Sequence, residues 1–316
     1  MSYWSEFSYP KVRLGVALVA VALVAVWLFM PIRIDEWWGY GVIKQVTNGE
    51  KLYGDVFFGS TPLSVLLGST TLELRMPDLL ALRLMTTASC AVVMIATDYM
   101  LFRCGVVRYT RLAVALMLAV LFVPACQWQI YAGLALGTAF LAIVLFEALG
   151  RTPIYATIAG VLAGLSVSTK YNVGVVALLA LLGVAWLTSA KTARLKTAAR
   201  IAAGAVCSIL VATVVPILLL GDLGEFVNQV LDKRAYGATG STSPLVGLAE
   251  LGGRIGNLDV FGALANPSFG FLVLSIVVVV LNLRAVRRGG SRAIVIIALL
   301  ACSIAVTFPR TDAIHV

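Results

Sequence analysis

The chain has 316 residues, of which 60% are hydrophobic and 12% are charged, and its mean hydropathy is +0.98. Soluble domains carry about 25% charged residues, so this composition excludes a soluble globular protein and predicts many membrane-spanning helices. The net charge of +9 does not indicate nucleic-acid binding, because the basic residues form short clusters between apolar runs rather than a stripe with interleaved aromatic residues.

The apolar runs predict an all-α, polytopic membrane protein with about nine transmembrane helices. Most runs approach the roughly 20 residues that cross a bilayer. They cover residues 14–30, 79–102, 112–125, 131–149, 154–169, 173–188, 201–220, 269–283 and 293–307. The runs at 112–125, 154–169 and 293–307 are short for a full crossing, so we expect these helices to extend into their flanks.

Charged residues change sign from one end of each run to the other. The basic residues at alternate ends are Lys11, Arg13, Arg103, Arg108, Arg111, Arg151, Lys191, Arg194, Lys196, Arg200, Arg284, Arg287, Arg288 and Arg292. The acidic residues at the remaining ends are Asp35, Glu36, Glu50, Asp55, Glu73, Asp78, Asp222, Glu225, Asp232, Glu250, Asp259 and Asp312. We expect a multi-pass protein of a bacterial cytoplasmic membrane. Its orientation follows from the rule that cytoplasmic loops collect lysine and arginine. Its N-terminus would be cytoplasmic, and its acidic ends and C-terminus would lie on the outer face.

Two of the predicted outer segments are long, residues 31–77 and 221–267. In the first, Pro62 begins an apolar stretch at 62–68 that we expect to form a short helix on the membrane surface. In the second, residues 223–236 are amphipathic, and the Gly/Ser/Thr-rich residues 237–244 predict a loop. The chain contains no internal repeat, Walker motif or dinucleotide-binding motif. We therefore expect residues 1–316 to form a single membrane-embedded domain.

An acidic pair, Asp35 and Glu36, follows the first apolar run directly and is flanked by Trp37 and Trp38. Acids at such a position are often solvated caps or topology residues. The functional alternative is a general base that removes a proton from an acceptor hydroxyl, or a metal ligand. Adjacent residues on a helix or turn point in different directions, so we expect one of the two to do the chemistry and favour Asp35.

Candidate cations lie at two of the outer boundaries. Lys170 separates two apolar runs, with Asn172 two residues later. A lysine there often extends its ammonium group harmlessly to water. Alternatively, its compact charge would suit a lipid phosphate, and Asn172 would add a hydrogen bond. Near the end of the chain, Arg310 emerges with Asp312 and His315. This segment is either an ordinary tail or a site where the guanidinium binds phosphate through two hydrogen bonds.

Two charges, Arg83 and Asp98, lie inside the second apolar run. A charge within a span costs about 2.5–3.5 kcal/mol on insertion scales and usually faces a cavity or a partner. Arg83 is near the outer end, where its side chain can reach the membrane surface. Asp98 is about one turn from Arg103, so we expect these two residues to form a local structural pair.

The first outer segment resembles that of the membrane-embedded GT-C glycosyltransferases, in the branch with protein O-mannosyltransferases and lipid A aminoarabinose transferases. Members of this branch open with a span, an Asp-Glu pair, a Gly-x-x-Tyr-x-Asp passage and a proline-led juxtamembrane helix. The corresponding residues here are Asp35-Glu36, Gly49-Glu50-Lys51-Leu52-Tyr53-Gly54-Asp55, which has one residue more between the glycine and the tyrosine, and Thr61-Pro62-Leu63. Arg83 in the second span and Lys170 at an outer helix boundary also fit. Many members have more spans and an outer C-terminal domain, so the resemblance does not indicate the acceptor.

This resemblance implies a GT-C-like fold and an inverting glycosyltransferase. Such an enzyme moves a sugar from a polyprenyl-phosphate donor to a hydroxyl of a glycan, lipid or protein. Asp35 would be the catalytic base, with Glu36 beside it. The donor-phosphate ligands would be Lys170, Arg310 and, less centrally, Arg83. The other substrate contacts would be Tyr53, Asp55, Asn172, Asp312 and His315. No cofactor is required, although a divalent metal is compatible with the acidic residues.

Two other functional classes remain open. A flippase or transporter of lipid-linked sugars also needs an apolar groove and cations for the phosphate, but it should tolerate Asp35→Asn. A non-catalytic subunit of a cell-envelope complex would also have long outer loops, but it would not require the clustered acids and cations.

Overall fold

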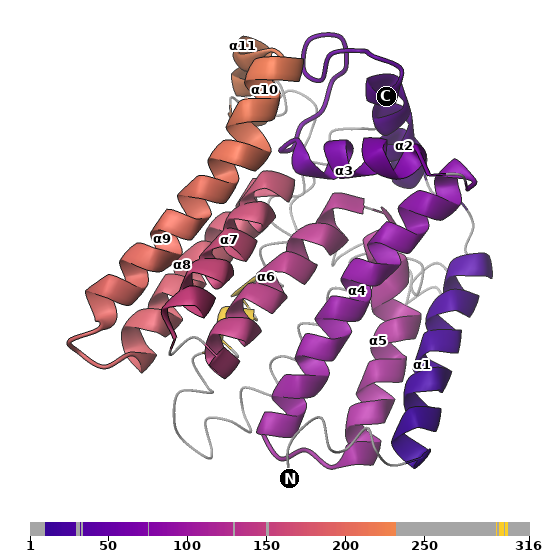
Figure 1. The fold of residues 1–316 in the computed structure, drawn as a ribbon. Coiled ribbons are helices and arrows are strands. Elements are labelled where there is room, and N and C mark those ends of the chain that lie inside the picture. Colours follow the sequence, from indigo (N-terminus) through magenta and orange to yellow (C-terminus); the bar gives the residue numbers. More distant parts are fainter. Residues whose placement is uncertain are drawn as a thin grey trace, which may run out of the picture.

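The computed structural model describes residues 10–29, 32, 34–74, 76–128, 130–149, 152–231, 295, 297–299 and 301–302. Within these ranges the chain consists of helices, turns and two isolated β-bridges, as expected for an all-α protein. Long helices stand side by side, and two short helices lie across one end of the bundle (Figure 1).

The long helices follow the predicted apolar runs as far as residue 220. They are α1 (Pro10–Phe29), α4 (Asp78–Arg103), α5 (Arg108–Trp128), α6 (Ile130–Leu149), α7 (Pro153–Thr169), α8 (Tyr171–Thr188), α9 (Arg194–Ile209) and its continuation α10 (Val215–Leu220). Among the described residues, the segments long and apolar enough to cross a membrane are Asp78–Arg103, Tyr131–Leu149, Tyr171–Thr188 and Arg194–Leu220. The run expected at 269–283 and most of the run at 293–307 lie outside the described residues, so the total of nine spans stays a prediction.

Small residues bring α7 and α9 close together. A Cβ atom at Gly160 of α7 would collide with the carbonyl of Ile201, and one at Gly204 of α9 would collide with the carbonyl of Thr157. Lipid tails are as apolar as the side chains they would replace, so close packing rather than apolar burial drives helices together in a membrane. Glycine at these two positions permits the approach.

The join between α9 and α10 is a π-helical turn, Leu210–Val214. Pro216 follows it in the first turn of α10. Proline has no N–H, and its ring clashes with the carbonyl four residues earlier in a regular α-helix. The wider turn relieves that clash, which allows one long helical segment to continue to Leu220.

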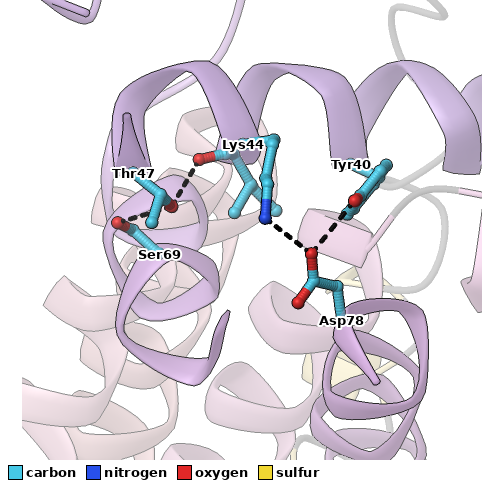
Figure 2. A network of polar contacts seen from close by, with 6 residues as sticks. Tyr40, Lys44, Thr47, Ser69 and Asp78 are labelled. Atoms are coloured by element: carbon cyan, nitrogen blue, oxygen red, sulfur yellow. Dashed lines mark hydrogen bonds and ion pairs between the residues drawn. The ribbon is translucent and has the colours of Figure 1, made fainter. Parts of the chain in front are cut away.

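One end of the bundle is covered by α2 (Ile34–Thr47), α3 (Leu63–Leu72) and the residues that connect them (Figure 1). The hydroxyl groups of Thr47 and Ser69 lie 3.0 Å apart and join α2 to α3 (Figure 2). After α10 the chain continues at this end through α11 (Leu223–Phe226) and a π-helical turn, Val227–Leu231. α3 is the short helix predicted after Pro62. We call this end of the bundle the capped end.

A layer of apolar side chains packs the capped end against the long helices. Its buried members are Val42, Ile43, Leu52, Tyr53, Val56, Phe58, Val65, Leu82, Leu134, Ile217 and Val230. They come from α2, the connecting loop, α3, α4, α6, α10 and the turn after α11. Residues 34–72 therefore form a packed layer that shares an apolar core with the ends of the long helices.

The predicted separation of charge is present along the bundle. Short connections make consecutive long helices antiparallel from α4 to α9, and α10 continues in the direction of α9 (Figure 1). The described acids at the capped end are Glu36, Glu50, Asp55, Glu73, Asp78, Asp222 and Glu225. The basic residues at the opposite end include Lys11, Arg103, Arg108, Lys191 and Lys196. Which end faces the cytoplasm stays a prediction.

Asp98 forms an ion pair with Arg111 of the neighbouring helix α5, whereas the sequence predicted a pair with Arg103 of its own helix. Its carboxylate accepts hydrogen bonds from Arg111 of α5 at 2.8 and 3.0 Å. Arg103, the partner expected from spacing along α4, contacts Glu147 of α6 at 3.0 Å. Spacing identifies neighbours within one helix, whereas these ion pairs depend on how separate helices pack.

Candidate functional site

Glu36 is buried against Arg83 at the capped end. Glu36 lies in the first turn of α2 and Arg83 in the second turn of α4. The guanidinium donates from Nε to Glu36 Oε1 at 2.5 Å and from Nη2 to Oε2 at 2.8 Å. The Arg83 and Glu36 side chains are only 8% and 1% exposed. Two parallel charge-assisted hydrogen bonds are strong and directional, so this pair attaches the start of α2 to α4.

The same face of α2 makes a second attachment to α4. Tyr40 and Lys44 follow Glu36 at intervals of four residues, which places all three on one face of the helix. Asp78, the first residue of α4, accepts a hydrogen bond from Tyr40 at 3.0 Å and one from Lys44 at 2.8 Å (Figure 2). The hydrogen bond to Asp78 raises the pKa of Lys44, and burial raises the pKa of Tyr40. Contacts of Glu36 near the start of α2, and of Tyr40 and Lys44 further along it, therefore fix the orientation of α2 relative to α4.

The loop after α2 depends on Tyr53 and Asp55 for its shape. Tyr53 has a φ of 69°, which non-glycine residues seldom adopt. Its side chain is fully buried, and its hydroxyl donates to the carbonyl of Ser60 at 2.6 Å. The carboxylate of Asp55, an exposed residue, accepts a hydrogen bond from the backbone N–H of Lys51 at 2.9 Å. Both residues have structural roles here, and their predicted contacts with substrate stay predictions.

This loop is attached to the end of α7, immediately before Lys170. Ser60 Oγ donates to the carbonyl of Thr169 at 3.2 Å, and Thr61 Oγ1 donates to the carbonyl of Val167 at 2.8 Å. The last carbonyls of a helix have no partner within it, so the loop hydroxyls complete this helix end. Lys170 has an extended backbone (φ −148°, ψ 101°) and joins α7 to α8. The loop therefore determines the backbone position next to this lysine.

A row of aromatic side chains leads from α2 to Lys170. Trp38 stacks on Phe58 with ring centroids 5.7 Å apart, and Phe58 meets Tyr131 edge-on at 6.0 Å. Lys170 Nζ lies 5.2 Å from the centroid of the Tyr131 ring, where an ammonium is attracted to the aromatic face. Position 35 precedes Trp38 by one helical turn, so the two positions share a face of α2. The row thus links α2, the helix that begins with the acidic pair, to Lys170 through successive ring contacts.

The structure brings some of the predicted site residues to the capped end. The predicted residues that it places at the capped end are Glu36, Tyr53, Asp55, Arg83, Lys170 and Asn172. Asp35 lies in the first turn of α2, but its side chain is outside the described part of the chain. Arg310, Asp312 and His315 also lie outside it. In the described ranges, no three His, Cys, Asp or Glu side chains are grouped so that they could hold a metal ion.

Three residues that the sequence analysis did not single out contribute to this region: Phe58, Tyr131 and Gln229. Phe58 lies in the loop between α2 and α3, residues 48–62, which we call the motif loop, and Tyr131 begins an apolar run. Aromatic residues in this loop and at the ends of apolar runs are a signal that could have identified both. Gln229 accepts a hydrogen bond from the Phe58 N–H at 3.0 Å and donates one to the Tyr53 carbonyl at 2.9 Å. It is more than 170 residues from either partner, and no local pattern marks it.

No known family model matches this chain, and no curated protein matches its sequence. Its structure is similar to the crystal structure of ArnT from Cupriavidus metallidurans bound to undecaprenyl phosphate, with a TM-score of 0.54 and 17% sequence identity. The chain shares the fold of ArnT. The likeness extends over 96% of this chain and 60% of ArnT, so the chain spans less than two thirds of ArnT's length. At this identity the likeness shows the fold alone, and it supports the GT-C-like membrane fold expected from the acidic motif.

Proposed function

We propose that this protein is a glycosyltransferase that moves a sugar from a polyprenyl-phosphate donor to an acceptor hydroxyl at the outer face of the membrane. The row Trp38–Phe58–Tyr131–Lys170 supports the proposal, because its contacts connect α2, which begins with the acidic pair, to a cation. A donor of this kind needs a cation for its phosphate, and the acceptor needs a base. The ArnT-like fold supports the choice of donor, since ArnT was crystallised with undecaprenyl phosphate bound.

Lys170 is the phosphate ligand in this proposal. Lys170 directly precedes α8, and its half-buried side chain lies against Tyr131 of α6. The N–H groups in the first turn of a helix also favour an anion, so the charge and the helix end act in the same direction. The leaving polyprenyl phosphate develops negative charge as the bond to the sugar breaks, and a preorganised cation stabilises that charge. Arg310 is the proposed second phosphate ligand.

Asp35 and Glu36 have different roles in this proposal. Both carboxylate oxygens of Glu36 accept hydrogen bonds from Arg83. In this proposal the pair holds the start of α2 in position, and Arg83 influences the site by holding Glu36. Asp35 takes the proton from the acceptor hydroxyl. The acceptor oxygen then bonds to the anomeric carbon as the bond from that carbon to the phosphate oxygen breaks, which inverts the anomeric centre. Polyprenyl phosphate leaves with the electron pair. The remaining proposed substrate contacts are Tyr53, Asp55, Asn172, Asp312 and His315.

Binding of undecaprenyl phosphate tests the role of Lys170. In lipid nanodiscs that hold the purified full chain, Lys170→Met should weaken binding about tenfold or more, because a charge-assisted contact with phosphate is lost. Affinity is obtained from the ligand-dependent rise of the thermal midpoint. Lys51→Met is the matched control: it removes an exposed lysine at the same end of the bundle, and it should bind like the wild type. If Lys170→Met bound as tightly as the wild type, Lys170 would not belong to a phosphate site.

The same preparations separate a transferase from a flippase. Asp35→Asn should bind undecaprenyl phosphate normally but should no longer consume polyprenyl-phosphate sugars from bacterial lipid extract, as followed by mass spectrometry. A flippase moves the lipid without breaking the sugar–phosphate bond and does not need a base. Wild-type protein that consumes no such lipid in the presence of an envelope extract, or an Asp35→Asn variant with normal turnover, would contradict the transferase proposal.

A further inference from the structure

Gln229 closes the motif loop from a segment far along the chain. Its single side-chain amide contacts both sides of the loop: Oε1 accepts from the Phe58 N–H at 3.0 Å, and Nε2 donates to the Tyr53 carbonyl at 2.9 Å. The oxygen and the nitrogen of the amide each make a hydrogen bond. The amide therefore holds Tyr53 and Phe58 at a defined distance from each other and attaches both to the segment after α10. The side chain is half-buried.

Other contacts dock the same segment on the loop. Phe226 meets the Tyr53 ring edge-on at 5.1 Å between centroids, and Val230 is fully buried in the apolar layer of the capped end. Gly221 forms a β-bridge with Leu52. The contacts surround Tyr53, whose positive φ is unfavourable for a residue with a side chain and persists only where its surroundings determine it. The segment after α10 therefore maintains the loop conformation.

Two routes lead from the residues held by Gln229 to Lys170. One passes through side chains, from Phe58 to Tyr131 at 6.0 Å and from Tyr131 to the ammonium at 5.2 Å. The other passes through hydrogen bonds that hold Ser60. The Tyr53 hydroxyl donates to the Ser60 carbonyl at 2.6 Å, and Ser60 Oγ donates to the carbonyl of the residue before Lys170 at 3.2 Å. The first route orients the ammonium, and the second fixes the backbone beside it.

We propose that Gln229 is a positioning residue of the phosphate site and that residues 221–231, the segment after α10, contribute to donor binding through it. This inference rests on the proposed role of Lys170. By holding Tyr53 and Phe58, the amide keeps the Tyr131 ring beneath the ammonium and keeps Ser60 on the end of α7. Gln229 acts on the donor through these residues and makes no contact with it.

Gln229→Leu tests the proposal, because leucine retains bulk but can neither donate nor accept a hydrogen bond. In the nanodisc assay, this variant should bind undecaprenyl phosphate about tenfold more weakly than the wild type, a loss on the scale of one or two hydrogen bonds. Asn228→Leu removes the neighbouring amide, which belongs to an exposed residue, and should leave binding unchanged. Gln229→Glu retains an oxygen for the Phe58 N–H but places a carboxylate oxygen against the Tyr53 carbonyl, so it should bind at least as weakly as Gln229→Leu. It also serves if the leucine variant does not fold.

A double-mutant cycle with Lys170→Met distinguishes positioning from a general loss of stability. If Gln229 acts through Lys170, the double variant should bind no more weakly than Lys170→Met alone. Additive losses would overturn the inference, as would normal binding by both Gln229 variants. The two proposals fail separately: if Lys170→Met weakens binding but the Gln229 variants do not, only the positioning role is wrong. Normal binding by Lys170→Met would remove the phosphate site and this inference with it.

Discussion

At the scale of single residues, the Glu36–Arg83 pair explains a charge inside an apolar run. The sequence places Arg83 within the second span, where a charge is costly unless it has a partner. Its partner comes from α2, 47 residues earlier in the chain. Both residues were site candidates from the sequence pattern alone, which resembles a known motif. The pattern assigned Glu36 to the catalytic motif and Arg83 to the donor phosphate, and it did not predict their contact, because nothing in the spacing of two distant residues shows that they meet.

This pair leads to a prediction about stability. Arg83→Met should lower the free energy of unfolding by about 3–5 kcal/mol, because the Glu36 carboxylate remains buried after its partner is removed. The measurement is denaturant-induced unfolding of the purified protein in detergent micelles. Replacing both residues, as in Arg83→Met with Glu36→Met, should recover most of the loss, because no charge is then left buried. A double variant as unstable as the sum of the two single variants would contradict the pairing.

At the scale of elements, helices from hydrophobic runs were easier to predict than helices at the surface. The runs predicted α4 and α6–α8 to within a few residues, because an uninterrupted apolar stretch of this length forms a helix in lipid whatever its neighbours. α2 was not predicted as a separate helix. Its residues 34–47 mix acidic, aromatic and glycine positions, and it is held by contacts with α4 and α3. Gly160 and Gly164, four residues apart on α7, form a pattern typical of close helix packing, but the pattern does not identify α9 as the partner.

The close contact between α7 and α9 predicts that alanine is destabilising at Gly160 but not at Gly183. Gly160→Ala should cost about 1–3 kcal/mol of stability, because the added methyl group meets the backbone of α9 and forces the helices apart. Gly183→Ala is the matched control, since an added Cβ there meets nothing within 4 Å, and alanine favours a helix by up to about 1 kcal/mol. Thermal midpoints in detergent should therefore fall for the first variant and stay constant or rise for the second. A similar fall in both variants would show that the contact is not tight.

At the scale of the whole molecule, charge separation and fold support the same general architecture. Acids gather at the capped end and basic clusters at the opposite end, as the sequence predicted from the positive-inside rule. The ArnT-like fold agrees with a multi-pass membrane protein. The separation was predictable because charge acts on insertion locally, at each end of each span. The side of the membrane on which the capped end lies follows from the same rule and is testable.

Accessibility to a membrane-impermeant maleimide tests this orientation. In a variant without the five native cysteines, Asn48→Cys at the capped end should be labelled in intact bacterial cells after the outer barrier is opened. Thr192→Cys, in the turn before α9 at the opposite end, should be labelled only after the cytoplasmic membrane is permeabilised. Both positions are exposed, so each controls for the reactivity of the other. The reverse pattern would place the acidic end in the cytoplasm and would contradict the outer-face assignment.

The sequence by itself determined that the protein is a multi-pass membrane protein. It also determined the approximate limits of the long helices and the separation of charge between their ends. Hydrophobicity and charge act over short stretches of chain, so a single run of residues contains enough information for each conclusion. The tertiary structure decided which side chains meet: Glu36 with Arg83, Lys170 with Tyr131, and Gln229 with the motif loop. These contacts join segments from 39 to 176 residues apart, and they exist only because packing brings separate helices and loops to the capped end.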